Sequence, residues 1–183
     1  WFLACDKPLL GKFLNPELLT NTNPSINAPF GFGEVNCTGR IDSQILIEAY
    51  RNFLTLSNQY LEETFQYDDL VENPKGLEYH SLKSQRIVFT EGFGVHKNPY
   101  FKYLPLEGTK GELITIHAPS LKLKSILKSS IFVIPMEADR YLVGSTYEWI
   151  DKTNTPTSEA KTELLEKLAR LIDCEFEVID QRA

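Results

Sequence analysis

The sequence predicts an α+β fold in which a mostly antiparallel sheet carries packed helices. Two segments repeat apolar residues at helical spacing, and about seven short runs are rich in β-branched and aromatic residues. These runs follow one another as a meander and do not alternate regularly with helices, which favours antiparallel pairing. A chain of 183 residues is long enough to bury one substantial core.

The first 38 residues are expected to form an irregular N-terminal segment. Prolines interrupt its short apolar pieces at positions 8, 16, 24 and 29. A single helical turn is expected over residues 16–19, because proline suits the first position of a helix.

Two amphipathic helices are expected. The first follows Asp42, a residue type that caps helix N-termini, and continues for about four turns. The second begins near Thr155-Pro156, again with proline in its first turn. The apolar faces are Ile45, Leu46, Ala49, Tyr50, Phe53 and Leu54 in the first helix, and Leu164, Leu165, Leu168, Leu171 and Ile172 in the second.

Short strands are expected over residues 64–70 and 77–80, on either side of the turn at 73–76. The run 86–90 is β-rich and is expected to be a buried strand that enters a loop at Glu91. The main sheet is expected to centre on residues 112–148 and 175–180.

Composition argues against several classes of partner and chemistry. The chain has 25 acidic and 19 basic residues, a net charge of −6, which disfavours nucleic acid or an anionic membrane as a partner. The three cysteines are widely spaced, so neither a zinc site nor a disulfide framework is expected, and reduced thiols fit a cytoplasmic protein. The histidines have no metal-ligand spacing, and no Gly-x-Ser-x-Gly elbow is present, so no catalytic residue and no metal site are expected.

Two Gly-x-Gly pairs occur, at residues 31–33 and 92–94, and neither continues to a third glycine. A dinucleotide site sets the pyrophosphate on a helix N-terminus, and the residues after these pairs do not read as a helix. The chain by itself is therefore not expected to bind FAD tightly. It also starts at Trp1 with no signal-peptide pattern, and we expect that preceding residues were removed.

Three segments carry a family resemblance in their order and spacing. They are Lys110-Gly111-Glu112, the apolar run 131–135, and the run 141–149 with Gly144-Ser145-Thr146 inside it. Together they resemble the substrate-binding sheet of FAD-dependent amine and amino-acid oxidases, the D-amino-acid oxidase and glycine oxidase superfamily. The resemblance is collinear from about residue 39 to residue 183.

The resemblance implies cofactor contacts at three positions. Leu70 matches the position that contacts the adenine end of FAD, and Gly92 matches a glycine that lets the chain turn close to the cofactor. Phe93 falls where an aromatic or small residue lies near the flavin.

The resemblance also implies substrate contacts at Phe132 and Tyr147. At position 132 the family often has a tyrosine, so this chain lacks one hydroxyl donor there. For both residues simple packing in the sheet is the alternative interpretation. The family's substrate-binding arginine would follow residue 183, and Arg182 does not have its register.

The resemblance therefore implies one substrate-binding-domain fragment of a longer oxidoreductase. Residues 1–38 would be the irregular segment, 39–94 would border the FAD-binding domain of the same protein, and 95–183 would form the substrate sheet and helix. The complete protein would oxidise the carbon–nitrogen bond of a small amine or amino acid, and the fragment alone would be colourless and inactive. A non-catalytic binding module or a tRNA-modifying flavoprotein on the same fold remains an alternative, as does an unrelated α+β interaction domain.

Overall fold

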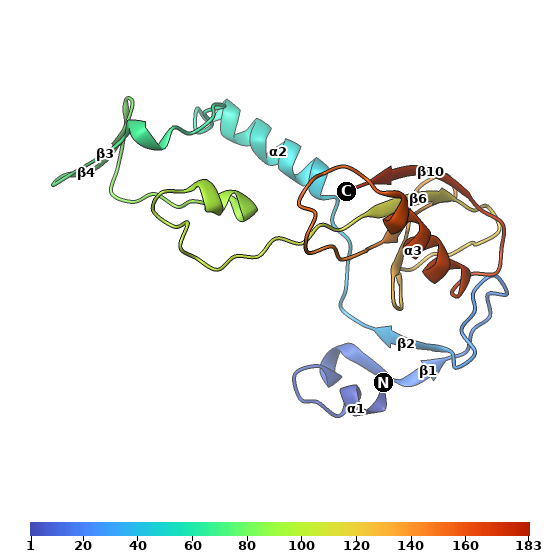
Figure 1. Ribbon diagram of the computed structural model, residues 1–183. Helices are drawn as coiled ribbons and strands as arrows, with labels where there is room; N and C mark the ends of the chain where they lie inside the picture. Colours follow the sequence, from blue (N-terminus) through green and yellow to red (C-terminus); the bar gives the residue numbers. More distant parts are fainter. The chain divides into compact units, whose positions relative to one another are not determined.

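The computed structural model describes residues 1–183 and has an α+β architecture with antiparallel sheets and few helices (Figure 1). The chain divides into two compact units, one made of residues 1–38 and 108–183 and the other of residues 39–107. The first unit therefore combines both ends of the chain, and the second is a single insertion between them.

The first unit is built on a five-stranded antiparallel sheet with the order β10-β6-β9-β8-β7. It lies where the sequence predicts the main sheet. β6 and β9 are in register through the pair Ile114–Val143, and β8 places Val133 beside Val143. The strands are β6 (Leu113–His117), β7 (Leu127–Lys128), β8 (Phe132–Pro135), β9 (Arg140–Gly144) and β10 (Glu177–Arg182).

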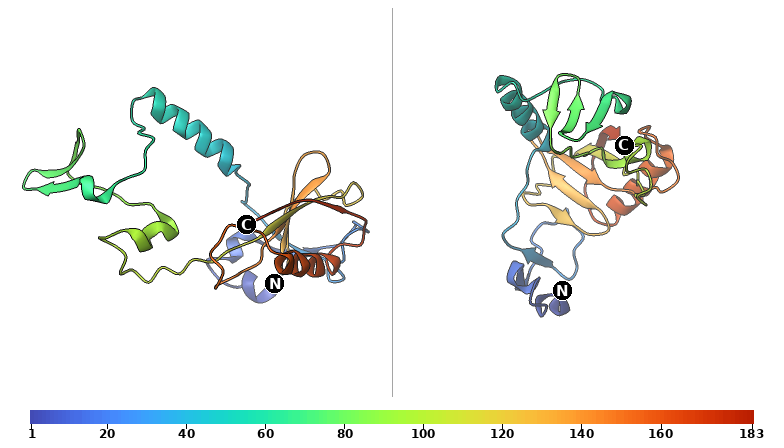
Figure 2. Two further views of the ribbon diagram at one scale, coloured as in Figure 1. Left: turned by 45° about the horizontal axis from the view of Figure 1, so that its top comes forward. Right: turned by 90° about the vertical axis from the view of Figure 1, so that its left-hand side faces the viewer.

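Helix α3 (Ser158–Ala169) covers one face of this sheet (Figure 2). Its Leu164 and Leu168 are fully buried and join one apolar core with the buried valines and isoleucines of β6, β8 and β9. Each such side chain contributes about 1.5–3 kcal/mol when it leaves water. The predicted second helix is confirmed, although it begins at Ser158 with Thr157 as its N-cap.

The N-terminal segment contains a two-stranded ribbon. β1 (Leu14–Leu19) pairs antiparallel with β2 (Phe32–Val35), so the helical turn expected over residues 16–19 is wrong. Pro16 fits this strand because the register shifts between Leu14 and Leu18, and proline is accepted at such irregular strand positions. The segment also contains α1 (Phe2–Cys5) and the 3-10 helix η1 (Gly11–Phe13).

The second unit contains the predicted first helix. α2 (Ser43–Leu56) begins after Asp42, whose carboxylate accepts the backbone N–H groups of Gln44 and Ile45. Both hydrogen bonds satisfy donors that a helix N-terminus otherwise leaves free. The apolar face of α2 is exposed along its length.

The second unit also contains a small sheet with the order β3-β4-β5. The strand expected at 77–80 and the preceding turn are confirmed, because β3 and β4 pair through Asn73 and Gly76. The strand expected at 64–70 is wrong in extent, since residues 67–69 form the 3-10 helix η2 and the strand starts at Leu70. The bounds are β3 (Leu70–Asn73), β4 (Gly76–Tyr79), β5 (Leu82–Ser84), η2 (Tyr67–Asp69) and η3 (Gly92–Lys97).

The run 86–90 is not a strand, and only Phe89 in it is half-buried, which corrects the sequence-based expectation of a buried strand. Val88 is 81% exposed, and no strand of the second unit pairs with this run. An apolar, β-branched run becomes a buried strand only where neighbouring strands and covering layers are available, and this unit supplies neither. No helix in the chain is both long enough and apolar enough to span a membrane.

Candidate functional site

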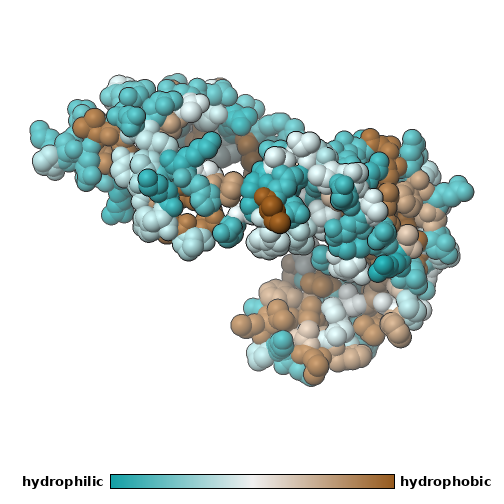
Figure 3. All heavy atoms as spheres, in the orientation of Figure 1, coloured by the Kyte–Doolittle hydropathy of each residue, from teal (hydrophilic) through white to brown (hydrophobic).

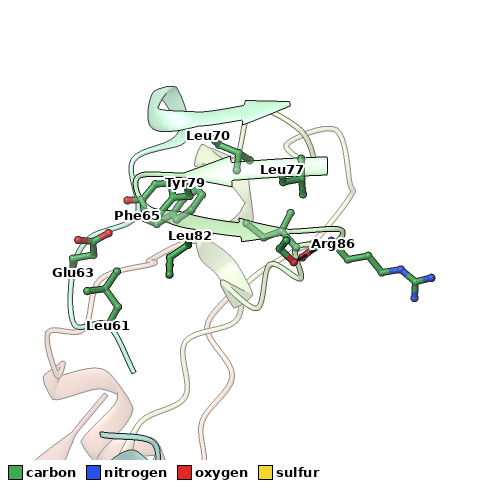
Figure 4. A pocket seen from close by; sticks show the side chains of 10 residues that line it. Leu61, Glu63, Phe65, Leu70, Leu77, Tyr79, Leu82 and Arg86 are labelled. Carbon is green, nitrogen blue, oxygen red and sulfur yellow. Dashed lines mark hydrogen bonds between the residues drawn. The ribbon is translucent and has the colours of Figure 1, made fainter. Parts of the chain in front are cut away.

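An apolar hollow of about 320 Å³ lies on the small sheet of the second unit (Figure 4). Leu70, the first residue of β3, lines it together with Phe65 and Tyr79, whose rings stack with centroids 4.4 Å apart. Glu63 and Arg86 also line it, and the guanidinium group of Arg86 extends away from the apolar side chains (Figure 4). The remaining lining residues are Leu61, Leu77, Leu82, Ser84 and Ile87.

A second hollow, of about 640 Å³, lies along the run 87–92 of the same unit. Gly92 lines it and has φ +55°, a left-handed conformation that glycine adopts without strain. A Cβ atom at Gly92 would meet no atom within 4 Å, so space is open beside this backbone. Phe93 does not line either hollow; it is half-exposed, and its ring meets His96 edge to face at 4.9 Å.

A polar cluster that sequence reasoning missed adjoins Gly92. The carboxylate of Glu91 accepts the hydroxyl of Tyr67 and the amide of Asn98, the latter at 2.7 Å. Asn98 is fully buried, and its own oxygen accepts backbone N–H groups at 2.8 and 3.2 Å. The hydrogen bond to Glu91, followed by burial, raises the pKa of Tyr67. The cluster therefore fixes the 3-10 turn that carries Gly92.

The two residues expected to contact substrate lie in the first unit. Phe132 opens β8 opposite Gly144 and is half-buried, and the Nζ atom of Lys128 lies 5.8 Å from the centroid of its ring. Tyr147 follows β9 and is 72% exposed. Neither residue lines either of the two hollows of the second unit.

The strongest charged constellation is a buried network around Lys110 and Glu112. Lys110 donates from Nζ to Asp151 at 2.7 Å and to the carbonyl of Thr155, and it lies 3.4 Å from Glu112. Glu112 accepts the backbone N–H and the hydroxyl of Thr157, each at 2.9 Å. Gln181 of β10 donates to the same carboxylate at 2.8 Å. The network joins the start of β6, the end of β10 and the N-terminus of α3.

The network stabilises the charged forms of its members. The hydrogen bond from Lys110, followed by the backbone N–H of Thr153, holds the pKa of Asp151 at about 2. Burial acts to raise the pKa of Glu112, but the hydrogen bonds from Thr157, Gln181 and Lys110 outweigh it and lower the pKa. The hydrogen bond to Asp151 is the main cause of the raised pKa of Lys110.

No group of three or more His, Cys, Asp or Glu side chains could hold a metal ion, and all three cysteines are free thiols. Of the Gly-x-Gly pairs, residues 31–33 lead into β2, and residues 92–94 lie in η3. Neither pair opens an α-helix.

No protein-family model matches the chain. Among solved structures, a glycine oxidase from Bacillus cereus ATCC 14579 is similar over 40% of this chain, with 22% sequence identity and a TM-score of 0.35. The matched part spans 22% of the oxidase chain. The fold itself defines the chain as an α+β protein with antiparallel sheets.

Proposed function

We propose that the chain is the substrate-binding part of an FAD-dependent oxidoreductase. The complete protein would oxidise the carbon–nitrogen bond of a small amine or amino acid. Residues 1–38 would be its N-terminal segment, 39–94 would border the FAD-binding domain of the same protein, and 95–183 would carry the substrate sheet and helix. The observation that carries the proposal is the uncovered apolar surface of residues 39–107.

That surface has two parts. The apolar face of α2 exposes Ile45 and Phe53, with exposed fractions of 64% and 59%, and the run 86–90 exposes Val88. Large apolar side chains that stay exposed along an element mark a candidate interaction site. The sheet of the first unit, by contrast, has a closed core, although apolar side chains outside that core, such as Phe30 and Ile150, also reach the surface (brown in Figure 3).

The composition of the run Ile87-Val88-Phe89 indicates which kind of domain could pack against it. Near-continuous apolar runs are typical of strands in parallel sheets, because helices cover both faces of such sheets. Nucleotide-binding domains have this architecture and bind their ligand beside the ends of the strands. Gly92 follows the run in a left-handed turn with open space beside it. This sequence of features favours an FAD-binding domain as the partner of the surface.

The residues of this chain would then have defined tasks. Leu70, Gly92 and Phe93 would contact FAD, which accepts hydride from the carbon next to the substrate nitrogen. Phe132 would supply an apolar wall, and the exposed hydroxyl of Tyr147 would orient the substrate. Cytoplasmic location fits the free thiols.

Anaerobic mixing of the full-length protein with a panel of amines and amino acids tests the proposal. We expect that one class of substrate bleaches the flavin absorbance. Tyr147→Phe should raise KM for that class, and Tyr103→Phe, which changes another exposed tyrosine, should not. A full-length protein that binds FAD but is reduced by no substrate would instead be a non-catalytic flavoprotein module or a tRNA-modifying flavoprotein.

A further inference from the structure

The backbone on both sides of Tyr147 is held by Lys110 and Glu112. Lys110 and Glu148 exchange two backbone hydrogen bonds of 2.8 Å. On the other side, Glu112 donates its N–H to the hydroxyl of Thr146 at 3.0 Å and accepts the N–H of Thr146 at 3.3 Å. Tyr147 therefore sits between two fixed points, although its own side chain faces water.

The side chains of the same two residues hold the segment that follows. Lys110 reaches Asp151 and the carbonyl of Thr155 with one ammonium group. Asp151 in turn accepts the N–H of Thr153 at 2.8 Å. Glu112 then fixes Thr157, the N-cap of α3. Both ends of the segment 146–157 are thus hydrogen-bonded to Glu112 of the Lys-Gly-Glu triplet.

The held segment presents large apolar side chains to solvent. Tyr147, Trp149 and Ile150 are all exposed, and Ile150 has an exposed fraction of 90%. A contact residue on a held backbone binds with less loss of conformational entropy than one on a free loop. Stability alone is a weak reason for the buried charges beneath it, because well-packed apolar residues often serve a core equally well.

We propose that Lys110 and Glu112 are positioning residues that hold the segment 146–157 in one conformation and so fix the place of Tyr147. Only the role of Tyr147 in substrate contact rests on the proposed function. The two charged residues touch neither substrate nor cofactor in this assignment. They act through the loop that they anchor.

The test uses this chain with Trp1→Phe, so that Trp149 is the only tryptophan. In this background we would make Glu112→Gln and Lys110→Met, with Asp139→Asn as the matched control, since it breaks the exposed Lys122–Asp139 pair. Hydrogen exchange of the Glu148 and Thr157 amides should become about tenfold faster in the first two variants. Each of these substitutions removes charge-assisted hydrogen bonds that hold the segment 146–157. Fluorescence anisotropy of Trp149 should fall in parallel.

Exchange at Ile114 and Val143, in the centre of the sheet, should stay slower than exchange at Glu148 and Thr157 in the same variants, because the segment opens without unfolding of the sheet. Equal free energies of opening at all four amides would show a role in global stability only and would overturn the proposal. Unchanged anisotropy of Trp149 would overturn it as well. If both variants fail to fold, Asp151→Asn replaces the partly exposed carboxylate that pairs with Lys110. The fluorescence anisotropy of Trp149 must still fall in that variant. None of these measurements depends on flavin or turnover, so failure of the proposed function leaves their outcome intact.

Discussion

The side chains of Lys110 and Glu112 point into the first unit and find their partners far along the chain. Their partners at positions 151, 155, 157 and 181 come from the loop after β9, the start of α3 and the end of β10. The sequence identifies the triplet through its resemblance to a family motif. It does not reveal the partners, because no periodicity or local spacing connects residues 41 to 69 positions apart.

Glu112→Gln should lower the free energy of unfolding of the first unit by about 2 kcal/mol, because the donors of Thr157 and Gln181 lose a charged acceptor in the core, while Asp151 still compensates Lys110. Urea unfolding followed through amide resonances of β6 measures this. Glu163→Gln, in an exposed pair, is the control and should change stability by less than about 0.5 kcal/mol. Equal effects of the two substitutions would contradict the role assigned to Glu112.

Acid should destabilise the first unit within a defined range of pH. The folded pKa of Asp151 is about 2, below its ordinary value of 3.8, so its contribution is complete above about pH 3.8 and is lost as the pH falls toward 2. Glu112, whose pKa is also lowered, acts in the same direction. Thermal unfolding between pH 5 and pH 2 should show this loss, and Asp151→Asn should make it shallower. A pH dependence identical to that of the unsubstituted chain would contradict the ion pair with Lys110.

At the scale of elements, periodicity predicted both long helices, and the caps at Asp42 and Thr157 set their first turns. Periodicity does not say whether an apolar face finds a cover within the chain. α3 buries its face against the sheet, whereas α2 exposes its own. Sequence patterns likewise do not show whether a pairing strand is available. The strand predicted at residues 86–90 is therefore wrong, because no strand of its unit pairs with this run. Strand formation depends on partners, which composition alone cannot supply.

The two helices should therefore respond differently to truncation. Leu164→Ala should cost about 3 kcal/mol, because it leaves a cavity in a closed core. Phe53→Ala in α2 should change the stability of this chain by less than about 0.5 kcal/mol, since its side chain is 59% exposed and belongs to no buried core. Chemical unfolding of both variants, followed by residue-specific amide signals, makes the comparison. A large cost at Phe53 would mean that α2 is covered.

At the scale of the whole molecule, the units differ in completeness. The first unit has a continuous core, and the second has two hollows and an uncovered apolar surface. The class of fold and the centre of the main sheet could be predicted from patterns of apolar residues. The expected ligand residues Leu70 and Gly92 each line a separate hollow, and Phe93 lines neither. These three residues could therefore contact one FAD molecule only if a further domain covers this surface and completes the site, as the proposed function requires.

Under the proposed function, a partner domain completes the second unit and holds FAD there. Titration of FAD into the full-length protein and into the 183-residue chain, followed by flavin absorbance and fluorescence, tests it most directly. We expect about one FAD bound per full-length chain and none bound to the 183-residue chain. A full-length protein that is colourless and binds no added FAD would contradict it.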